Sequence, residues 1–363
     1  MTDLVQRSID VIHAGQASSG AYVASPTFSQ YQACWMRDGA LIACSMDRVG
    51  DHASARRFYE WAFRTLSRYE TRIENVLAQT AYGKTLEESD YLPTRFTLEG
   101  GLVSGQWWDF QLDGYGAWLW ALVEHIQATG DRAFYSQIRP LVVQVVRYLS
   151  GLWPQPNYDC WEENRDRVHL STLAALYGGL AALARLDPAL NTAPTAAQIR
   201  DFCLRQGVAE GHFVKYLGNS AVDASLLWIA VPYGLVALDH PVFQATLSAI
   251  ERDLHVPGGG VYRYRADVYY GGGEWLLLAA WLGWVYVQQG RRREADAVLH
   301  WIEAQADPEG LLPEQVEQHL LHPEHLRSWV ERWGTSARPL LWSHAMYLIL
   351  HSALAEHPAC EEL

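Results

Sequence analysis

The sequence has few charged residues, and acidic residues outnumber basic ones. Asp, Glu, Lys and Arg make up 19% of the 363 residues, a share too low for a coiled coil or a disordered chain. The formal net charge of −13 argues against nucleic acid and anionic membranes as partners, because both would repel an acidic surface. Hydrophobic residues make up 49% of the chain, which is enough for a large buried core.

Cysteine motifs and targeting segments are also missing. The five cysteines include no C-x-x-C motif, which argues against a disulfide framework or a zinc site and favours a reducing compartment. The first residues lack the basic and apolar regions of a signal peptide, and apolar stretches such as 275–287 are too short to span a bilayer. We therefore expect a cytoplasmic protein with buried thiols at Cys34, Cys44, Cys160, Cys203 and Cys360.

Aromatic residues are abundant, with 16 Trp and 19 Tyr. A large aromatic core explains part of this number. A cleft for sugars explains another part, because the apolar faces of sugar rings stack on indole and phenol rings whose polar atoms remain free to hydrogen-bond. We expect both uses in this protein.

Helical periodicity dominates the chain, and the predicted helices come in pairs. The junctions Gly50-Asp51 and Gly130-Asp131 predict tight turns, because Gly suits the position after a helix and Asp the position before one. Pro232 is expected to kink its helix. The twelve predicted helices cover residues 4–14, 37–49, 52–69, 113–129, 132–152, 167–186, 193–205, 224–238, 242–254, 275–289, 291–306 and 340–355.

Short turns join the helices of each pair, and long loops join one pair to the next. In an up-and-down array this alternation places all long loops at one end. Six such pairs, the last closing on the first helix, predict an all-α double ring, an (α/α)6 barrel, with residues 1–363 as a single domain. Its inner ring would contain the helices that follow the long loops at 15–36, 70–112, 153–166, 206–223, 255–274 and 307–338.

Two of these loops carry the most informative residues. Glu162 follows Trp161 in the third loop, and Glu314 lies in the sixth. These loops should lie opposite each other across the ring, which would put both carboxyl groups on one pocket. Two such groups are what glycoside hydrolysis needs, since one protonates the leaving oxygen and the other activates water. Burial beside Trp161 and the neighbouring Glu163 would raise the pKa of Glu162, as an acid requires.

The ordered motifs in these loops resemble the glucoamylase-like family of inverting α-glucoside hydrolases, glycoside hydrolase family 15. The resemblance covers roughly residues 30–350. Its motifs occur in the family order, so the set is far more specific than any one of them. They are Trp35-Met36-Arg37-Asp38, Gln111-Leu112-Asp113-Gly114, Trp161-Glu162-Glu163, Arg263-Tyr264 with Asp267 and Tyr269-Tyr270-Gly271-Gly272, Glu314-Gln315, and Leu341-Trp342-Ser343-His344-Ala345.

The resemblance implies that Glu162 is the general acid and Glu314 the general base, without a cofactor or a metal. An inverting pair of this kind stands roughly 6.5–9.5 Å apart, which leaves room for a water. Arg37 and Asp38 would hold the terminal glucose, although an ion pair at a helix start is the structural alternative. The remaining sugar contacts that the resemblance implies are Trp35, Trp107 or Trp108, Trp161, Glu163, Arg263 and Trp342.

Other polar residues have more than one interpretation. Asp113 is either a plain helix cap or a sugar contact. His319, His322 and His325 recur every three residues, a spacing that suggests a metal, but a solvated loop is the favoured interpretation. The segment 211–216 matches no motif that we can assign.

The sequence therefore predicts an exo-acting enzyme that releases β-glucose from the non-reducing end of short α-gluco-oligosaccharides. Bacterial members of the family often carry an N-terminal β-sandwich, whereas this chain begins with the predicted helix 4–14, which favours short substrates over starch. The linkage remains open between α-1,4, α-1,6 and the α,α-1,1 bond of trehalose. The alternatives are a non-catalytic carbohydrate-binding or regulatory protein on the same barrel, a trehalase of the same family, and a hexosamine epimerase.

Overall fold

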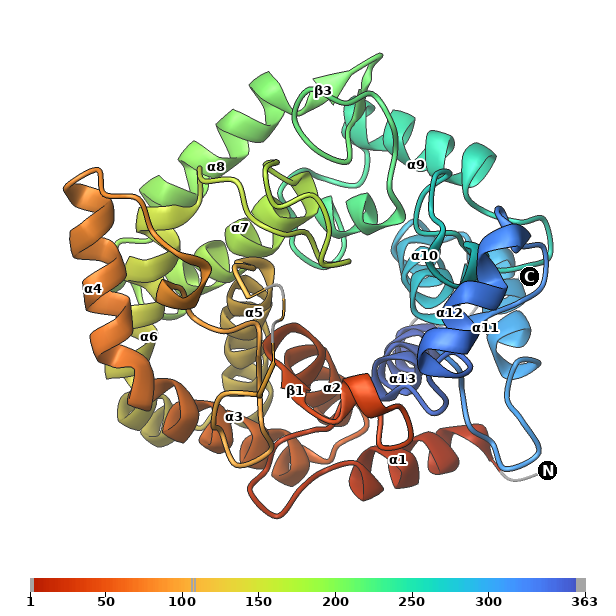
Figure 1. The fold of residues 1–363 in the computed structure, drawn as a ribbon, viewed down its shortest axis with the longest axis horizontal. Helices are drawn as coiled ribbons and strands as arrows, with labels where there is room; N and C mark the ends of the chain where they lie inside the picture. The colour runs from red at the N-terminus through yellow and green to blue at the C-terminus, as the bar shows by residue number, and fades with distance from the viewer. Residues whose placement is uncertain (1–2, 106, 108, 357–363) are drawn as a thin grey trace, which may run out of the picture.

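The computed structural model describes residues 3–105, 107 and 109–356, and its helices form two concentric rings (Figure 1). Six elements form the inner ring, and each contacts the next until the last contacts the first. Most of their residues are buried, which explains why α10 is apolar on every side. The inner elements in ring order are α2 (Met36–Arg48), α5 (Asp113–Thr129), α7 (Leu170–Leu186), η5 (Ala224–Ile229), α10 (Leu276–Gln288) and α13 (Leu341–Glu356).

Each inner element has an outer partner that follows it in the chain and packs against it. The exception in order is α1, which precedes the ring and packs against α13, as the predicted closing pair requires. This arrangement confirms the predicted (α/α)6 barrel. The outer helices are α1 (Leu4–Ala14), α3 (His52–Leu66), α6 (Arg132–Leu152), α8 (Ala193–Gln206), α9 (Pro241–Asp253) and α11 (Arg292–Glu303).

The short turns between paired helices have the predicted chemistry. Gly130 adopts a φ of 68° after α5, and the side chain of Asp131 accepts a hydrogen bond from the backbone N–H of Phe134 in α6. Asp51 caps α3 in the same way, through the N–H of Ser54. Gly tolerates the left-handed conformation and Asp satisfies a free N–H at the helix start, so a few residues reverse the chain.

The helix predicted at 224–238 is wrong. The chain forms only the 3-10 helix η5 and then irregular turns. Pro232 has no N–H to continue helical hydrogen bonding, and its ring disfavours a helical conformation at Val231. The predicted kink is therefore a complete stop.

Two predicted loops contain helices. The α4 helix (Glu70–Ala81) lies outside α6 and packs against it, and the side chains of Ile73 and Val76 in α4 are buried. The α12 helix (Leu326–Trp333) lies in the sixth loop and has no fully buried residue. Both were missed because they stand outside the paired pattern from which the ring was predicted.

Three pairs of very short antiparallel strands tie the loops together. The pair β1 (Cys34–Trp35) and β2 (Arg95–Phe96) joins the first loop to the second, with Trp35 opposite Arg95. The third pair, β5 (Glu274–Trp275) and β6 (Gln315–Val316), joins the fifth loop to the sixth. β3 (Val208–Ala209) pairs with β4 (His212–Phe213) in the fourth loop.

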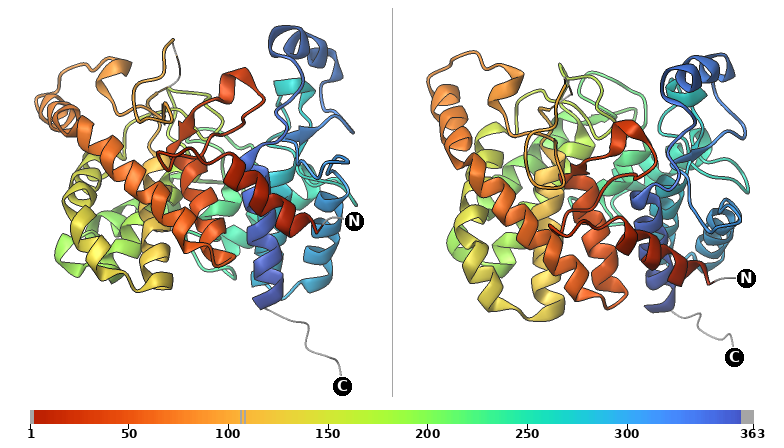
Figure 2. Two further views of the ribbon diagram at one scale, coloured as in Figure 1. Left: turned by 90° about the horizontal axis from the view of Figure 1, so that it is seen from below. Right: turned by 60° about the horizontal axis from the view of Figure 1, so that its bottom comes forward.

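The long loops and α12 gather at one end of the rings, and the short turns lie at the other (Figure 2). Because β1 and β5 end where α2 and α10 begin, the strand pairs place the loops directly over the inner ring. No helix in the described part of the chain is both long enough and apolar enough to cross a membrane.

His344 connects three parts of the ring near the start of α13. Its buried Nε2 accepts a hydrogen bond from the N–H of Leu312 at 3.0 Å, and its Nδ1 lies 2.9 Å from the hydroxyl of Ser8 in α1. Burial lowers the pKa of His344 to about 3. The neutral imidazole therefore holds the segment that leads to Glu314.

This burial predicts a pH-dependent stability. The unfolded imidazole takes up a proton below about pH 6.5, whereas the folded one does not until about pH 3, so the folded state loses stability as pH falls through this window. The free energy of unfolding should therefore rise with pH between pH 4 and 6. We expect His344→Gln to reduce the slope of this rise by up to about 1.4 kcal/mol per pH unit. Urea titrations of both proteins measure this, and identical slopes would contradict it.

Candidate active site

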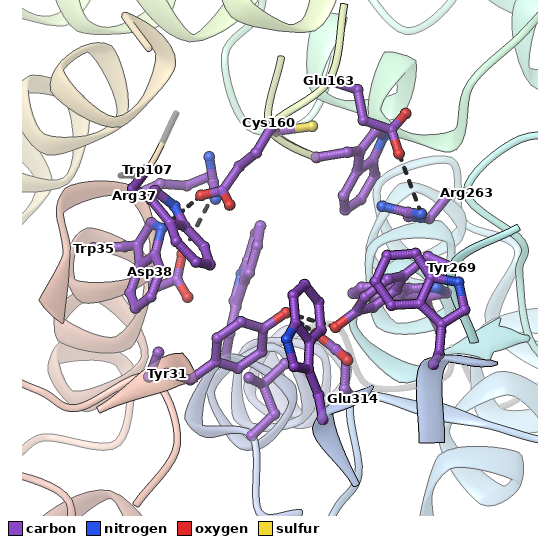
Figure 3. Close-up of a pocket in the computed structure, with 18 of the residues that line it drawn as sticks. Tyr31, Trp35, Arg37, Asp38, Trp107, Cys160, Glu163, Arg263, Tyr269 and Glu314 are labelled. Atoms are coloured by element: carbon purple, nitrogen blue, oxygen red, sulfur yellow. Dashed lines mark hydrogen bonds and ion pairs between the residues drawn. The ribbon is translucent and has the colours of Figure 1, made fainter. Parts of the chain in front are cut away.

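A pocket of about 250 Å³ opens at the loop end of the ring (Figure 3). Residues from five of the six long loops line it, together with the first residues of α2 and α13. The lining residues are Ala24, Tyr31, Trp35, Arg37, Asp38, Trp107, Cys160, Trp161, Glu162, Glu163, Arg263, Val268, Tyr269, Trp275, Glu314, Trp329, Trp333, Leu340 and Trp342.

Glu162 lies in a tight turn of the third loop. The side chain of Asp159 accepts hydrogen bonds from the backbone N–H groups of Trp161 and Glu163, at 3.0 and 2.9 Å. Between them Glu162 adopts a φ of 67°, a left-handed conformation that costs energy for a residue with a side chain. The turn directs the Glu162 carboxyl to Trp35, whose Nε1–H donates to it at 2.7 Å.

The electrostatic environment of Glu162 acts in two directions. Burial raises the pKa of Glu162 above its ordinary value. The positive charge of Arg37 and hydrogen bonds from Trp35, Trp107 and Gln111 lower it, but burial prevails. A carboxyl group in this position retains its proton to a higher pH than an exposed one.

Glu314 is 2% exposed and lies directly before β6. Its Oε1 accepts a hydrogen bond from the hydroxyl of Tyr31 at 3.0 Å, and its Oε2 accepts one from Ser336 at 3.2 Å. The Tyr31 oxygen in turn lies 2.9 Å from the hydroxyl of Tyr269. Burial raises the pKa of Glu314 to about 7, although the hydroxyls of Tyr31 and Ser336 and the charge of Arg263 oppose this rise. The group can therefore gain and lose a proton near neutral pH.

Arg37 and Asp38 lie in the first turn of the inner helix α2 and are both buried at the pocket wall. Arg37 Nη1 donates to Asp113 at 3.0 Å and to Gln111 at 3.1 Å, and its Nε lies 3.5 Å from an Asp38 oxygen. Burial raises the pKa of Asp38 to about 7, against the effect of Arg37. Its Oδ1 is buried and has no hydrogen-bond partner in the described part of the chain, so Asp38 presents an acceptor to the pocket.

Asp113 is not among the residues that line the pocket. It is 1% exposed at the first residue of α5, and its Oδ2 holds Arg37 from behind. Asp113 is not the predicted plain helix cap, because it lies inside α5 and orients Arg37. Its predicted sugar contact stays a prediction.

Glu163 and Arg263 face each other on a second wall of the pocket (Figure 3), with Glu163 Oε1 3.5 Å from Arg263 Nη2. Tyr264 donates its hydroxyl to Glu163 Oε2 at 2.5 Å. The buried Arg263 guanidinium also pairs with Asp267 and lies over the ring of Trp161. This wall is therefore a network of charges, whereas aromatic rings form much of the rest.

The structure brings together the predicted aromatic residues that it describes. Trp35, Trp107, Trp161 and Trp342 all line the pocket, whereas Trp108 lies outside the described residues. The buried Nε1 of Trp342 has no hydrogen-bond partner among the described residues and is available to an oxygen of a ligand.

Several pocket residues were not predicted. Tyr31 and Tyr269 belong to polar and aromatic clusters that the sequence shows, but their hydrogen bond joins positions 238 residues apart. Trp329 and Trp333 were missed with their helix, although a spacing of four residues is itself a sign of a helix face.

Among the described residues, Asp47, His52 and His125 have ligand atoms close enough together for a metal ion. They lie near the short-turn end, far along α2 from Arg37 and Asp38. Both imidazoles place Nδ1 at 2.8 Å from the same Asp47 oxygen, which is the geometry of a hydrogen-bonded triad. His319 also bonds a carboxylate, that of Glu274 at 2.8 Å.

Comparisons with known proteins agree with this geometry. The model of the family Glycosyl hydrolases family 15 matches residues 1–351. The chain is 46% identical to the isomaltose glucohydrolase of Kribbella flavida, over 98% of this chain and 94% of that protein.

Solved structures give the same result. A glycosidase that is 46% identical superposes with a TM-score of 0.93, covers 98% of this chain and 97% of its own, and has a variant in complex with glucose. The glucoamylase of Saccharomycopsis fibuligera, 15% identical, shares the fold with a TM-score of 0.74 over 97% of this chain and 96% of its own. This protein therefore belongs to glycosyl hydrolases family 15 and is a glycoside hydrolase.

Proposed function

We propose that this protein hydrolyses the α-glucosidic bond at the non-reducing end of short gluco-oligosaccharides and releases β-glucose. The observation that carries the proposal is that Glu162 and Glu314, 152 positions apart in the sequence, line one pocket. They belong to the loops before α7 and α13, which stand three places apart in a ring of six. The carboxyl groups thus approach the pocket from opposing sides, as an inverting reaction requires.

In the proposed reaction Glu162 is the general acid. Its burial favours the protonated form, which gives its proton to the glycosidic oxygen as the bond from that oxygen to C1 breaks. Glu314 is the general base and takes a proton from the water that attacks C1 from the opposite face. The new C1–O bond forms on that face, so an α-glucoside gives β-glucose. Tyr31 and Ser336 donate to Glu314 and fix its orientation.

The other walls suit a terminal glucose. Asp38 would accept hydrogen bonds from sugar hydroxyls, and Arg37, fixed by Asp113, would donate to them. Glu163 and Arg263 would contact the sugar beyond the broken bond. Trp35, Trp107, Trp161 and Trp342 would pack against the apolar ring faces.

The pocket favours short substrates, because Trp329 and Trp333 of α12 form part of its wall. The relative from Kribbella flavida is named an isomaltose glucohydrolase, and we therefore propose the α-1,6 bond of isomaltose as the first substrate. Maltose and trehalose are the alternatives to test.

The proposal treats residues 1–363 as one catalytic domain. We also propose the cytoplasm as its location, because Cys34, Cys44, Cys160 and Cys203 form no disulfide within the described ranges, outside which Cys360 lies.

Proton NMR of the anomeric signals tests the reaction directly. With isomaltose we expect β-glucose before any α-glucose appears, and a drop in kcat of about 10²- to 10⁴-fold in Glu162→Gln and in Glu314→Gln. α-Glucosyl fluoride should restore much of the rate to Glu162→Gln alone, since fluoride leaves with little help from an acid. Glu317→Gln, an exposed carboxyl in the same loop, is the control.

Early α-glucose would contradict the inverting mechanism. Hydrolysis of maltose or trehalose in preference to isomaltose would overturn the proposed linkage and keep the mechanism. Binding of all three sugars without hydrolysis would favour the non-catalytic alternative.

The pKa of Glu314 predicts the pH dependence on the acidic side. Glu314 must be ionised to accept a proton, so kcat/KM should fall as pH decreases below about 7. Ser336→Ala removes a donor that favours the ionised form of Glu314. The pKa of Glu314 should therefore rise, and the acidic limb of the plot of kcat/KM against pH should move to higher pH. Ser328→Ala removes a hydroxyl that donates to the backbone carbonyl of His325, the residue before α12, and should leave the acidic limb in place. A limb that stays in place or moves down in Ser336→Ala would refute the assignment.

We expect Trp333 to contribute to binding of the leaving sugar and not of the terminal glucose. Loss of its ring in Trp333→Ala should raise the KM for isomaltose about tenfold, the value of one stacking contact. Kinetics on α-glucosyl fluoride, which has no second sugar, should stay within twofold of the wild type. Val330→Ala controls for disturbance of α12, because Val330 does not line the pocket. Equal effects on both substrates would place Trp333 at the terminal glucose instead.

A further inference from the structure

The fourth loop carries a buried cation that the reaction above does not use. The 363-residue chain contains only two lysines, Lys84 and Lys215, while its other basic side chains are arginines. Lys84 is exposed, whereas the side chain of Lys215 is 6% exposed. Lys215 follows β4 in the segment that matched no motif in the sequence.

Three carboxylates surround the Lys215 ammonium. Its Nζ lies 2.9 Å from Asp223, 3.5 Å from Asp159 and 3.6 Å from Glu163. It also lies 3.3 Å from the centre of the Tyr264 ring, a cation–π contact. Burial lowers the pKa of Lys215, but the charges of Asp223 and Asp159 outweigh this effect and keep the group positively charged.

Two of these carboxylates hold the turn that contains Glu162. Asp159 accepts hydrogen bonds from the backbone N–H groups of Trp161 and Glu163, on either side of Glu162. Asp223 accepts the indole N–H of Trp161, the residue before Glu162, at 3.0 Å. Lys215 therefore neutralises the groups that impose the left-handed conformation of Glu162 and fix the indole beside it.

The third carboxylate belongs to the pocket wall. Glu163 accepts a hydrogen bond from the Tyr264 hydroxyl and faces Arg263, which also forms an ion pair with Asp267. His169 lies behind, with Nδ1 3.9 Å from Asp159. Arg263 shares its charge between Asp267 and Glu163, and Lys215 is the cation that contacts all three carboxylates among the residues that the structure describes. Without it they would repel one another in a buried site.

A lysine suits this place better than an arginine. Its ammonium is a compact charge with three donors, which can approach three carboxylates that converge from different directions. The planar fork of a guanidinium matches one carboxylate face to face. The use of lysine here, in a chain that otherwise relies on arginine, fits that requirement.

We propose that Lys215 is a positioning residue for the catalytic acid. Lys215 holds the turn 159–163 so that Glu162 and Glu163 face the substrate. The inference rests on the proposed function and adds to it a role for the fourth loop. Lys215 acts through Asp159, Asp223 and Glu163 and does not line the pocket.

The test replaces Lys215 by methionine, which retains the length of the side chain and removes the charge, with Lys84→Met as the matched control. We expect kcat on isomaltose to fall about 100-fold in Lys215→Met, within the range that general acid catalysis supplies. Hydrolysis of α-glucosyl fluoride, which depends little on the acid, should fall less than about tenfold. Lys84→Met should match the wild type on both substrates.

A second readout is independent of activity. The indole N–H resonance of Trp161, assigned by its loss in Trp161→Phe, should shift in Lys215→Met and not in Lys84→Met, because its acceptor Asp223 loses its partner. Activity on isomaltose within twofold of the wild type would overturn the proposal, and so would equal losses on both substrates. If the wild type hydrolyses neither substrate, the proposed function fails, and the Trp161 resonance alone decides whether Lys215 positions the turn.

Discussion

Carboxyl groups that are cut off from bulk water determine how the open end of this helical ring is built. Asp38 and Glu314 are each less than a tenth exposed, and burial raises the pKa of both to about 7. Such groups need hydrogen-bond donors or cations nearby, and a sugar hydroxyl would supply the donor that Asp38 Oδ1 lacks among the described residues. The tyrosine, serine and tryptophan donors around the pocket, and its buried arginines, follow from this requirement. The same environment makes proton transfer near neutral pH possible.

The ring supplies the geometry that this chemistry needs. Inner helices are buried on all sides and cannot move far, so the first residues of α2 and α13 are fixed points. The strand pairs then attach neighbouring loops to one another over these points. Glu162 and Glu314 therefore meet across a pocket through the order of elements in the ring. Asp159 in the third loop and His344 in α13 hold the segments that carry them.

Much of this architecture is present in the sequence as a pattern. Alternating loop lengths and helix periodicity predicted the double ring, because each helix pair buries an apolar face that only its neighbours can cover. The loop motifs predicted which carboxyl groups would converge. Periodicity carries no information on contacts between loops, so the Tyr31–Tyr269 hydrogen bond and the three partners of Lys215 could not be predicted. Pro232 was visible, but its effect on η5 was underestimated.

In the proposed reaction Glu162 and Glu314 stand on opposite sides of the bond that breaks, with a water between Glu314 and C1. A crystal structure of the wild type with the sulfur-linked analogue of isomaltose, which resists hydrolysis, would measure this directly. We predict that the two carboxyl groups lie about 6.5–9.5 Å apart with an ordered water bonded to Glu314. A separation of about 5–5.5 Å without room for that water would contradict inversion and indicate a covalent intermediate instead.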